Sequence, residues 1–270
     1  MNLSIRIHTL LTILLTISLA VISFYGAFDL STYERDATSI AVQGIGQDFV
    51  DLFLIVPVLV ISLIFTLRSS IIGLFIHSGI SLYIVYSFFI YCFGVHFNNL
   101  FLWYCAVLGL SFYTFIIDIR LLSLIENRRE SSRKFPVKST AIYFLVIAVM
   151  FYTLWLKDII PAIATDGVPT TVSDYRLLVN PVHVLDIALV LPGLIIAAFL
   201  LLRKKRYAFL LAPVLLIFII LMAIALIGMV IAMLFKGVSD ESSVAAIFTL
   251  LAVAGIVLLI PGLKSFKRYE

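Results

Sequence analysis

The chain has 270 residues, of which 63% are hydrophobic and 13% charged, and its mean hydropathy is +1.19. Water-soluble domains are about half apolar and a quarter charged, so this composition excludes a soluble globular protein and indicates an integral membrane protein. The formal net charge of +4 is no sign of nucleic-acid binding, because basic residues beside membrane spans act as anchors at the lipid surface.

The apolar runs are continuous, and each is long enough to cross a bilayer as a helix of about 20 residues. The expected fold class is therefore all-α, a polytopic membrane protein. Eight transmembrane helices are predicted at residues 7–28, 49–67, 70–94, 99–118, 139–157, 182–202, 207–235 and 243–263. Asn180 and Pro181 mark the start of the sixth helix, because asparagine is a favoured N-cap and proline suits the first helical position. The first run lacks a small-residue cleavage site and is expected to be a retained helix rather than a signal peptide.

The basic residues predict the orientation of the chain. If the N-terminus lies inside, the cytoplasmic segments hold 15 of the 19 Lys and Arg residues. The positive-inside rule then predicts a multi-pass protein of the cell membrane with both termini in the cytoplasm. The expected partners are membrane lipids, with anionic lipid or a protein contacting the basic stretch 126–138, and no nucleic acid. A homo-oligomer is compatible with the sequence.

One pattern of three residues occurs twice, 135 residues apart: Asp51, Pro57 and Arg68, then Asp186, Pro192 and Arg203. The same offset aligns the first predicted span with the fifth. Such self-similarity predicts a repeat architecture, here two four-helix units in residues 1–118 and 139–270, joined by a basic cytoplasmic linker, 119–138. Because four is an even number, both units enter the membrane from the same side, and the repeats are parallel rather than inverted.

The repeated prolines and arginines have structural explanations. Pro57 and Pro192 are expected to kink their helices, because proline removes a backbone hydrogen bond and frees a carbonyl four residues earlier. Each arginine follows its aspartate by 17 residues, which corresponds to about 26 Å of helix rise, close to the hydrocarbon thickness. Arg68 and Arg203 are therefore expected at the inner interface as anchors.

Asp51 and Asp186 are the main candidates for a ligand or ion site. Ionisable groups within spans usually face the bundle interior or a water-filled cavity and often mark function. A structural polar contact explains them equally well, and Asp51 could instead pair with Asp48 as a cap at a later helix start. The other candidates are polar residues near the same outer helix ends, which could line an outward-open vestibule: His183, Gln47, Asn98 and Asn180.

Other polar residues have simpler interpretations. His77, about two turns into the third span, is expected to be a neutral packed histidine, with proton handling as the alternative. Cys92 and Cys105 are expected to be buried thiols, although a disulfide is conceivable between adjacent outer helix ends. The outer aromatic residues of spans three and four fit an interfacial belt, and a pocket for a planar or lipidic ligand is the alternative. No Cys/His metal-ligand spacing occurs in the sequence, so no cofactor is predicted and the identity of any metal is unknown.

No nucleophile elbow, zinc-protease motif or phosphate-binding loop occurs in the sequence, and an enzyme is not expected. An enzyme that pairs the two aspartates is an alternative. Parallel repeats, kinked helices and intramembrane acids predict a small-solute or ion transporter or channel, with a site in the outer half between the repeats. The other alternative is a non-catalytic membrane sensor, an assembly factor or a subunit of a larger membrane complex.

Three stretches carry a resemblance: GQDFVDLFLIVPVLVISL, YCFGVHFNNLFLWY and NPVHVLDIALVLPGLI. They resemble stretches of an uncharacterised family of bacterial multi-pass membrane proteins, and the similarity covers most of the chain. The resemblance implies a bacterial membrane protein and supplies no activity, substrate or catalytic residue.

Overall fold

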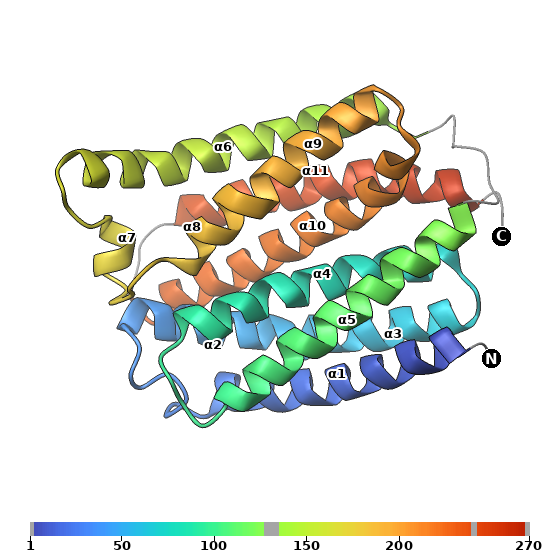
Figure 1. Cartoon of the computed structure of the whole chain (residues 1–270). Coiled ribbons are helices and arrows are strands. Elements are labelled where there is room, and N and C mark those ends of the chain that lie inside the picture. The colour runs from blue at the N-terminus through green and yellow to red at the C-terminus, as the bar shows by residue number, and fades with distance from the viewer. Residues whose placement is uncertain (1–2, 127–134, 239–241, 268–270) are drawn as a thin grey trace.

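The computed structural model describes residues 3–126, 135–238 and 242–267, and within these ranges the chain is helical, without strands. Eight of the described helices are long and apolar enough to cross a membrane, which confirms the predicted number of spans. They run side by side in one bundle, with both termini at the same end and the short helix α7 at the other (Figure 1). The chain is therefore an integral membrane protein. The basic stretch 126–138 lies mostly outside the described residues.

Six of the spans are single helices: α1 (Leu3–Phe28), α4 (Ile71–Gly94), α5 (Phe101–Glu126), α6 (Val137–Ala164), α10 (Arg206–Phe235) and α11 (Ser242–Lys267). The other two are each built from three pieces in sequence. The second span comprises α2 (Thr38–Val50), η1 (Asp51–Ile55) and α3 (Val56–Leu67). The sixth comprises α8 (Pro181–Leu185), η2 (Asp186–Val190) and α9 (Leu191–Leu202). The predicted cap of the sixth span is confirmed, because the Asn180 side chain accepts the Val182 N–H at 3.0 Å.

The second span begins about three turns before its predicted start at residue 49, because α2 opens at Thr38. Gly44 and Gly46 both lie within this helix. Gly46 permits a close helix crossing: a Cβ there would lie 2.6 Å from the carbonyl oxygen of Gly228 on α10. Asp48 consequently lies well inside the helix, and the explanation of Asp48 with Asp51 as a helix cap is wrong.

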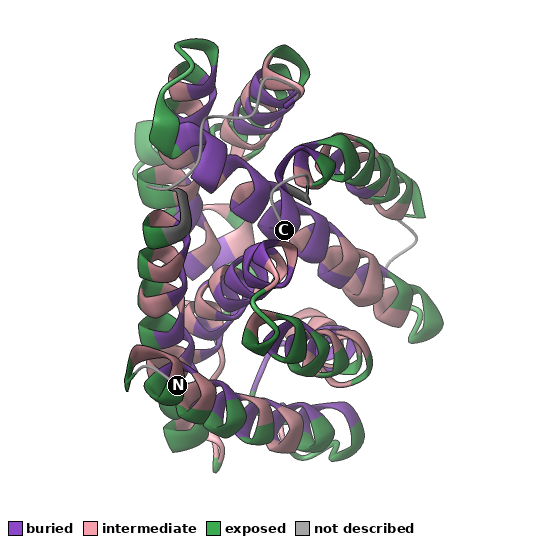
Figure 2. Cartoon of the chain, turned by 90° about the vertical axis from the view of Figure 1, so that its right-hand side faces the viewer, coloured by how far each residue is buried: buried purple, intermediate pink, exposed green. Residues whose placement is uncertain are grey.

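Helices α4 and α10 form the centre of the bundle and are its most buried spans (Figure 2). They pack against each other where Gly79 leaves room, since a Cβ there would lie 2.4 Å from the Ile217 side chain. Helices α3 and α5 pack against α4, and α2, α9 and α11 pack against α10. Large apolar side chains cover the outer faces of the bundle, as expected for surfaces that contact lipid.

Two wide π-turns, η1 and η2, directly precede the segments that carry Pro57 and Pro192. A proline ring clashes with the carbonyl four residues earlier and cannot donate to it. The wider turn relieves this clash, because the N–H of Leu191 bonds to the Asp186 carbonyl, five residues back. The neighbouring Ile187 carbonyl accepts the Tyr152 hydroxyl of α6 at 3.3 Å. The α-helical geometry is thus interrupted at the positions where the prolines predicted a kink, and a π-turn is a recognised cause of helix kinks.

The two proline-containing segments end alike. Arg68 and Arg203 are exposed at the C-terminal ends of α3 and α9. Each is followed by a residue in the left-handed conformation, Ser69 with φ 64° and Lys204 with φ 52°. These positions at helix ends are compatible with the predicted anchors, whose membrane role stays a prediction.

The connection between α6 and α8 carries a short helix, α7 (Thr170–Ser173). Helix α6 continues through Pro161 to Ala164, beyond the end predicted at residue 157. The two cysteines have free thiols; Cys92 is half-buried and Cys105 is exposed. The expectation of two buried thiols is therefore wrong for Cys105, which lies on an outward-facing position of α5.

Candidate functional site

A cavity of about 290 Å³ lies inside the bundle. Helices α2 and α4 line it on one side, and α6, the span from α8 to α9, α10 and α11 line it on the other. Of the residues predicted to form a site, it brings together Gln47, Asn180 and Asp186. A concave, mostly apolar space with a few convergent polar groups is the usual form of a small-molecule site.

Asp186 is the charged residue of this cavity, and its carboxylate is held from two helices. The Tyr86 hydroxyl of α4 donates to Oδ1 at 2.9 Å, and the Trp155 Nε1–H of α6 donates to Oδ2 at 2.8 Å. A carboxylate offers about four lone-pair positions, so both oxygens keep capacity to accept further hydrogen bonds. The two donors thus fix the direction of the Asp186 side chain, and its oxygens can still accept further hydrogen bonds.

The rest of the cavity wall is mostly apolar. Besides Asp186, Tyr86 and Trp155, the wall has polar residues from α2, α4 and the connection between α6 and α8: Gln43, Gln47, Ser87, Tyr91, Thr171, Tyr175 and Asn180. The apolar members include Phe151, Leu194, Phe218, Met222 and Phe248. A ligand that fits this lining needs an apolar body and one polar or cationic group.

Asp51 occupies the equivalent position in η1 but does not line the cavity. It is fully buried, and its Oδ1 accepts the Tyr83 hydroxyl at 2.6 Å. Its Oδ2 has no hydrogen-bond partner, although the Gln47 amide lies beside the carboxylate. The predicted vestibule shared by both aspartates is therefore not formed: Asp51 lies in packed protein and Asp186 borders open space.

His183 and Asn98 lie outside the cavity lining. The His183 ring packs against Trp155 with centroids 4.9 Å apart, so it supports the indole that holds Asp186. The Asn98 amide donates to the Thr32 carbonyl and to Tyr104, and its Oδ1 accepts the Leu100 N–H. Asn98 thus fixes the loop between α4 and α5.

Asp48, which the sequence suggested as a helix cap with Asp51, instead forms another buried carboxylate centre. It accepts hydroxyls from Tyr33, in the loop before α2, and from Tyr91 on α4. Burial and the neighbouring Asp48 carboxylate raise the pKa of Tyr33 well above its ordinary value, so this phenol stays a donor. Gly26 provides the space, because a Cβ at that position would overlap the Asp48 carboxylate.

Three tyrosines that hold Asp48, Asp51 and Asp186 belong to the aromatic set of the third span, for which an interfacial belt was preferred to a ligand pocket. Tyr83, Tyr86 and Tyr91 are instead buried in the bundle, and all three lie on α4. A signal was present in the sequence, since hydroxyl-bearing rings on one span can reach acids on its neighbours. Which acid each ring meets depends on the rotation of the helices, and a single sequence does not specify that rotation.

His77 belongs to another buried group at the opposite end of the bundle, together with His8 and Asp118. It contacts the Asp118 carboxylate at 3.0 Å, so the packed histidine that the sequence predicted also has a carboxylate partner. Comparisons of this chain with protein-family models, with curated proteins and with solved structures found no match. The class that the fold and cavity define is a polytopic helical membrane protein with an internal cavity.

Proposed function

We propose that the protein binds a small amphipathic cation in the cavity and carries it across the membrane. One observation carries this proposal. The Asp186 carboxylate, whose oxygens can accept further hydrogen bonds, borders an otherwise largely apolar cavity inside a membrane-spanning bundle. A cationic group would pair with Asp186 while its apolar body contacts the surrounding side chains. An inorganic ion would find few ligands on such a wall, so the lining favours an organic solute over an ion channel.

The proposed architecture is a pair of parallel four-helix repeats with the cavity between them. Several features recur 135 residues apart: η1 and η2, α3 and α9, the starts of α4 and α10, and the left-handed residues Ser69 and Lys204. Contacts between the halves are also reciprocal, since α2 packs against α10 while α8 packs against α4. In parallel-repeat transporters the substrate site lies at the interface of the repeats, which supports the cavity as that site.

For orientation, we propose that both termini are cytoplasmic and that the α7 end faces outward in the cell membrane. The excess of Lys and Arg at the loops of the terminal end supports this choice. The polar members of the cavity then lie in the outer half of the bilayer, at the depth proposed for the site.

The solute is proposed to enter sideways from the lipid, between α6 and α11. In the described residues these helices touch at few positions, among them the Phe151–Phe248 ring pair and the hydrogen bond from Tyr143 to the Leu251 carbonyl. Phe151, Phe248 and Leu251 all line the cavity. The corresponding helices of the first unit, α1 and α5, pack extensively. An opening on this side favours a solute that partitions into the bilayer.

A sensor that binds the same solute without moving it is the second candidate. It is favoured by the uneven placement of polar groups: those of the cavity come from residues near the α7 end, and among the described residues no matching set lines its deeper part. Binding and flux therefore have to be measured separately.

The test uses purified protein in liposomes and a panel of amphipathic amines, each paired with its uncharged analogue. Asp186→Asn is expected to weaken amine binding about tenfold or more, because a charge-assisted interaction is lost. Asp174→Asn, which removes the same charge from an exposed loop position, serves as the matched control. Amine binding that is equal in wild type and both variants, or equal for charged and uncharged compounds, excludes the proposed site. Binding without flux identifies the sensor.

A further inference from the structure

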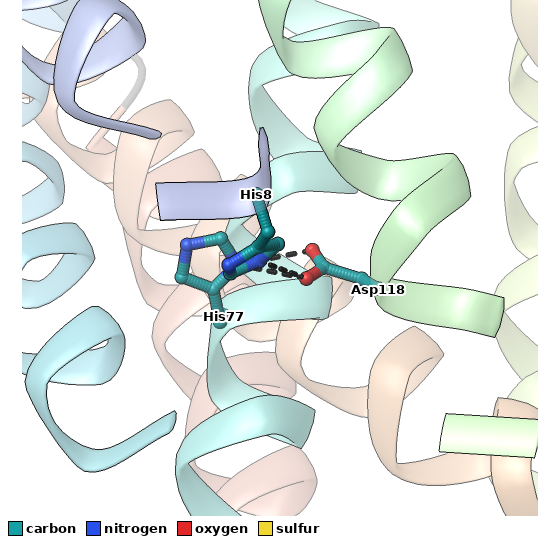
Figure 3. Close-up of side chains that lie close together, drawn as sticks. All are labelled: His8, His77 and Asp118. Atoms are coloured by element: carbon teal, nitrogen blue, oxygen red, sulfur yellow. Dashed lines mark hydrogen bonds and ion pairs between the residues drawn. The ribbon is translucent and has the colours of Figure 1, made fainter. Parts of the chain in front are cut away.

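Three buried titratable side chains converge at the end of the bundle opposite α7. His8 lies on α1, His77 on α4 and Asp118 on α5, and all three are fully buried (Figure 3). His8 Nε2 lies 2.7 Å from Asp118 Oδ1, and His77 Nδ1 lies 3.1 Å from Oδ1 and 3.0 Å from Oδ2. None of the three lines the cavity, so this group is separate from the proposed solute site.

Burial of these three ionisable side chains inside the bundle is unfavourable unless they are paired or bind an ion. His8 is five residues from the start of α1 and His77 is six from the start of α4, which places both about 8–9 Å inside the helix ends. Charges at such depth require a partner or a metal ion. If the repeats correspond as proposed, the second unit has Tyr143 in place of His8 and Ala212 in place of His77. The helical framework is therefore built a second time without a histidine at these positions.

The donor set is one that transition metals use. One ligand atom from each residue lies within 4.8 Å of the others. Two imidazole nitrogens and one carboxylate oxygen suit zinc, iron(II) and neighbouring divalent metals, and three protein ligands leave a coordination position open. Calcium and magnesium would require more oxygen ligands than this site offers.

Two hydroxyl groups support the orientation of these side chains. Thr12 Oγ1 lies 3.2 Å from His77 Nε2, and Ser81 donates to Asp118 Oδ2 at 2.9 Å. Hydrogen bonds of this kind to the far side of a ligand are typical of metal sites, where they fix ring tautomers and carboxylate direction. The ligands also come from three helices that pack together, α4 with α5 and α5 with α1.

The competing explanation is an ion pair between a protonated His77 and Asp118. In that state His77 would donate to Asp118 and to Thr12, and the Thr12 hydroxyl would donate to the His8 carbonyl, 2.9 Å away. His8 Nδ1 lacks a hydrogen-bond partner in either state, so it does not distinguish them. A single histidine suffices for the ion pair, whereas the second imidazole, which approaches the same carboxylate oxygen, is what a metal site requires.

We propose that His8, His77 and Asp118 bind a divalent first-row transition metal ion, with zinc as the first probe. The ligands would bind it as two neutral imidazoles and one carboxylate, and binding would release any proton held on the second imidazole. This proposal does not depend on the solute or on the direction of transport.

The experiment measures metal content in full-length protein purified without a histidine tag. The protein is stripped with a chelator, reloaded with zinc, desalted and analysed by mass spectrometry of the metal. Wild type is expected to retain close to one zinc ion per chain, and His77→Gln and Asp118→Asn to bind zinc at least about tenfold more weakly. His96→Gln is the matched control, because His96 also pairs with an aspartate, Asp36, but lies in a half-exposed loop position.

Thermal unfolding provides the second measurement, since zinc that binds the folded state raises the melting temperature. Zinc is expected to stabilise wild type and His96→Gln but not His77→Gln. If the variants do not fold, wild type alone is loaded with cobalt(II), whose visible spectrum reports bound nitrogen ligands. Wild type that retains no zinc, shows no cobalt spectrum and gains no stability overturns the proposal and leaves the ion pair as the explanation.

Discussion

Tyr83 and Tyr86 lie one helical turn apart on α4, and each donates its hydroxyl to a different one of the repeated aspartates. Tyr83 bonds Asp51 at 2.6 Å, and Tyr86 bonds Asp186 at 2.9 Å. The central helix α4 therefore donates a hydrogen bond to an aspartate of each proposed unit. The two contacts are not equivalent, because Asp186 has a second donor in Trp155 and borders the cavity.

Replacement of the two tyrosines by phenylalanine is expected to have unequal effects on stability. Tyr83→Phe removes the hydrogen bond of a fully buried carboxylate whose other oxygen has no partner, at a cost of about 1–3 kcal/mol. Tyr86→Phe leaves Asp186 bonded to Trp155 and is expected to cost less while weakening amine binding. Thermal unfolding in detergent and an amine titration measure these effects. Equal destabilisation by both variants would contradict the different environments of the aspartates.

A methyl group at the crossing of α2 and α10 is expected to be destabilising. Gly46→Ala forces a Cβ against the Gly228 carbonyl, and such overpacking costs about 1–3 kcal/mol. Gly193→Ala is the matched control, because a Cβ at Gly193 meets nothing within 4 Å. The control is expected to be neutral or stabilising, since alanine favours helix by about 1 kcal/mol. The close crossing is disproved if both variants unfold at the same temperature.

Replacement of Pro192 is expected to change amine binding more than thermal stability. Pro192→Ala restores a backbone donor and permits a regular helix, which would rotate the preceding residues relative to α9 and turn Asp186 away from its donors. We expect amine binding to fall, while the hydrogen bonds that Asp186 loses offset the stability gained from the regular helix, so that the melting temperature changes little. Pro161→Ala, at a helix-interior proline near the end of α6, is the control and is expected to leave binding unchanged. Unchanged binding in Pro192→Ala would show that the π-turn does not position the site.

A larger side chain inside the cavity is expected to block it. Ala223 lines the cavity, and Ala223→Phe would place a ring in existing space, so binding is lost at little cost in stability. Ala198→Phe, at a buried position that does not line the cavity, would overpack the protein and destabilise it by about 1–3 kcal/mol. Parallel binding and unfolding measurements distinguish the two. Strong destabilisation by Ala223→Phe would mean that the cavity does not exist as described.

Alkaline pH is expected to destabilise the region around Tyr33. Its raised pKa means that the folded state holds this proton more tightly than the unfolded state, so the stabilisation is complete below the unfolded pKa of about 10 and is lost as pH rises above it. Tyr33→Phe has no proton to lose and is expected to show a shallower decline in melting temperature above about pH 10. Identical pH profiles for wild type and Tyr33→Phe would contradict this burial.

The membrane class and the number of spans could be predicted from the sequence, because apolar length alone decides them. Asn180 and Pro181 also located one helix start correctly, since cap chemistry is local. The start of the second span could not be located, because a glycine that permits a helix crossing and a glycine that makes a turn look the same in one sequence. The role of Gly46 depends on Gly228, which is far away in the chain.

The candidate site was predictable only where one residue was unusual by itself. Asp186 was conspicuous as an acid in an apolar run, whereas its donors Tyr86 and Trp155 are common residues of membrane helices. His8 and Asp118 are 110 residues apart and come together only through the packing of α1 on α5. The recurring pattern in the sequence reveals Asp51 and Asp186, but the partners of these acids follow from helix rotation.

The unequal packing of the two four-helix units has a dynamic consequence. Helix α1 is held by α5 along the bundle, whereas α6 and α11 touch at few positions within the described residues, and α11 is the least buried span. Local opening requires the fewest contacts to break where the packing is sparse, so backbone amides exchange faster there. Helices α6 and α11 should therefore take up deuterium before α1 and α5. Local opening of the bundle should occur mainly on the side formed by α6 and α11.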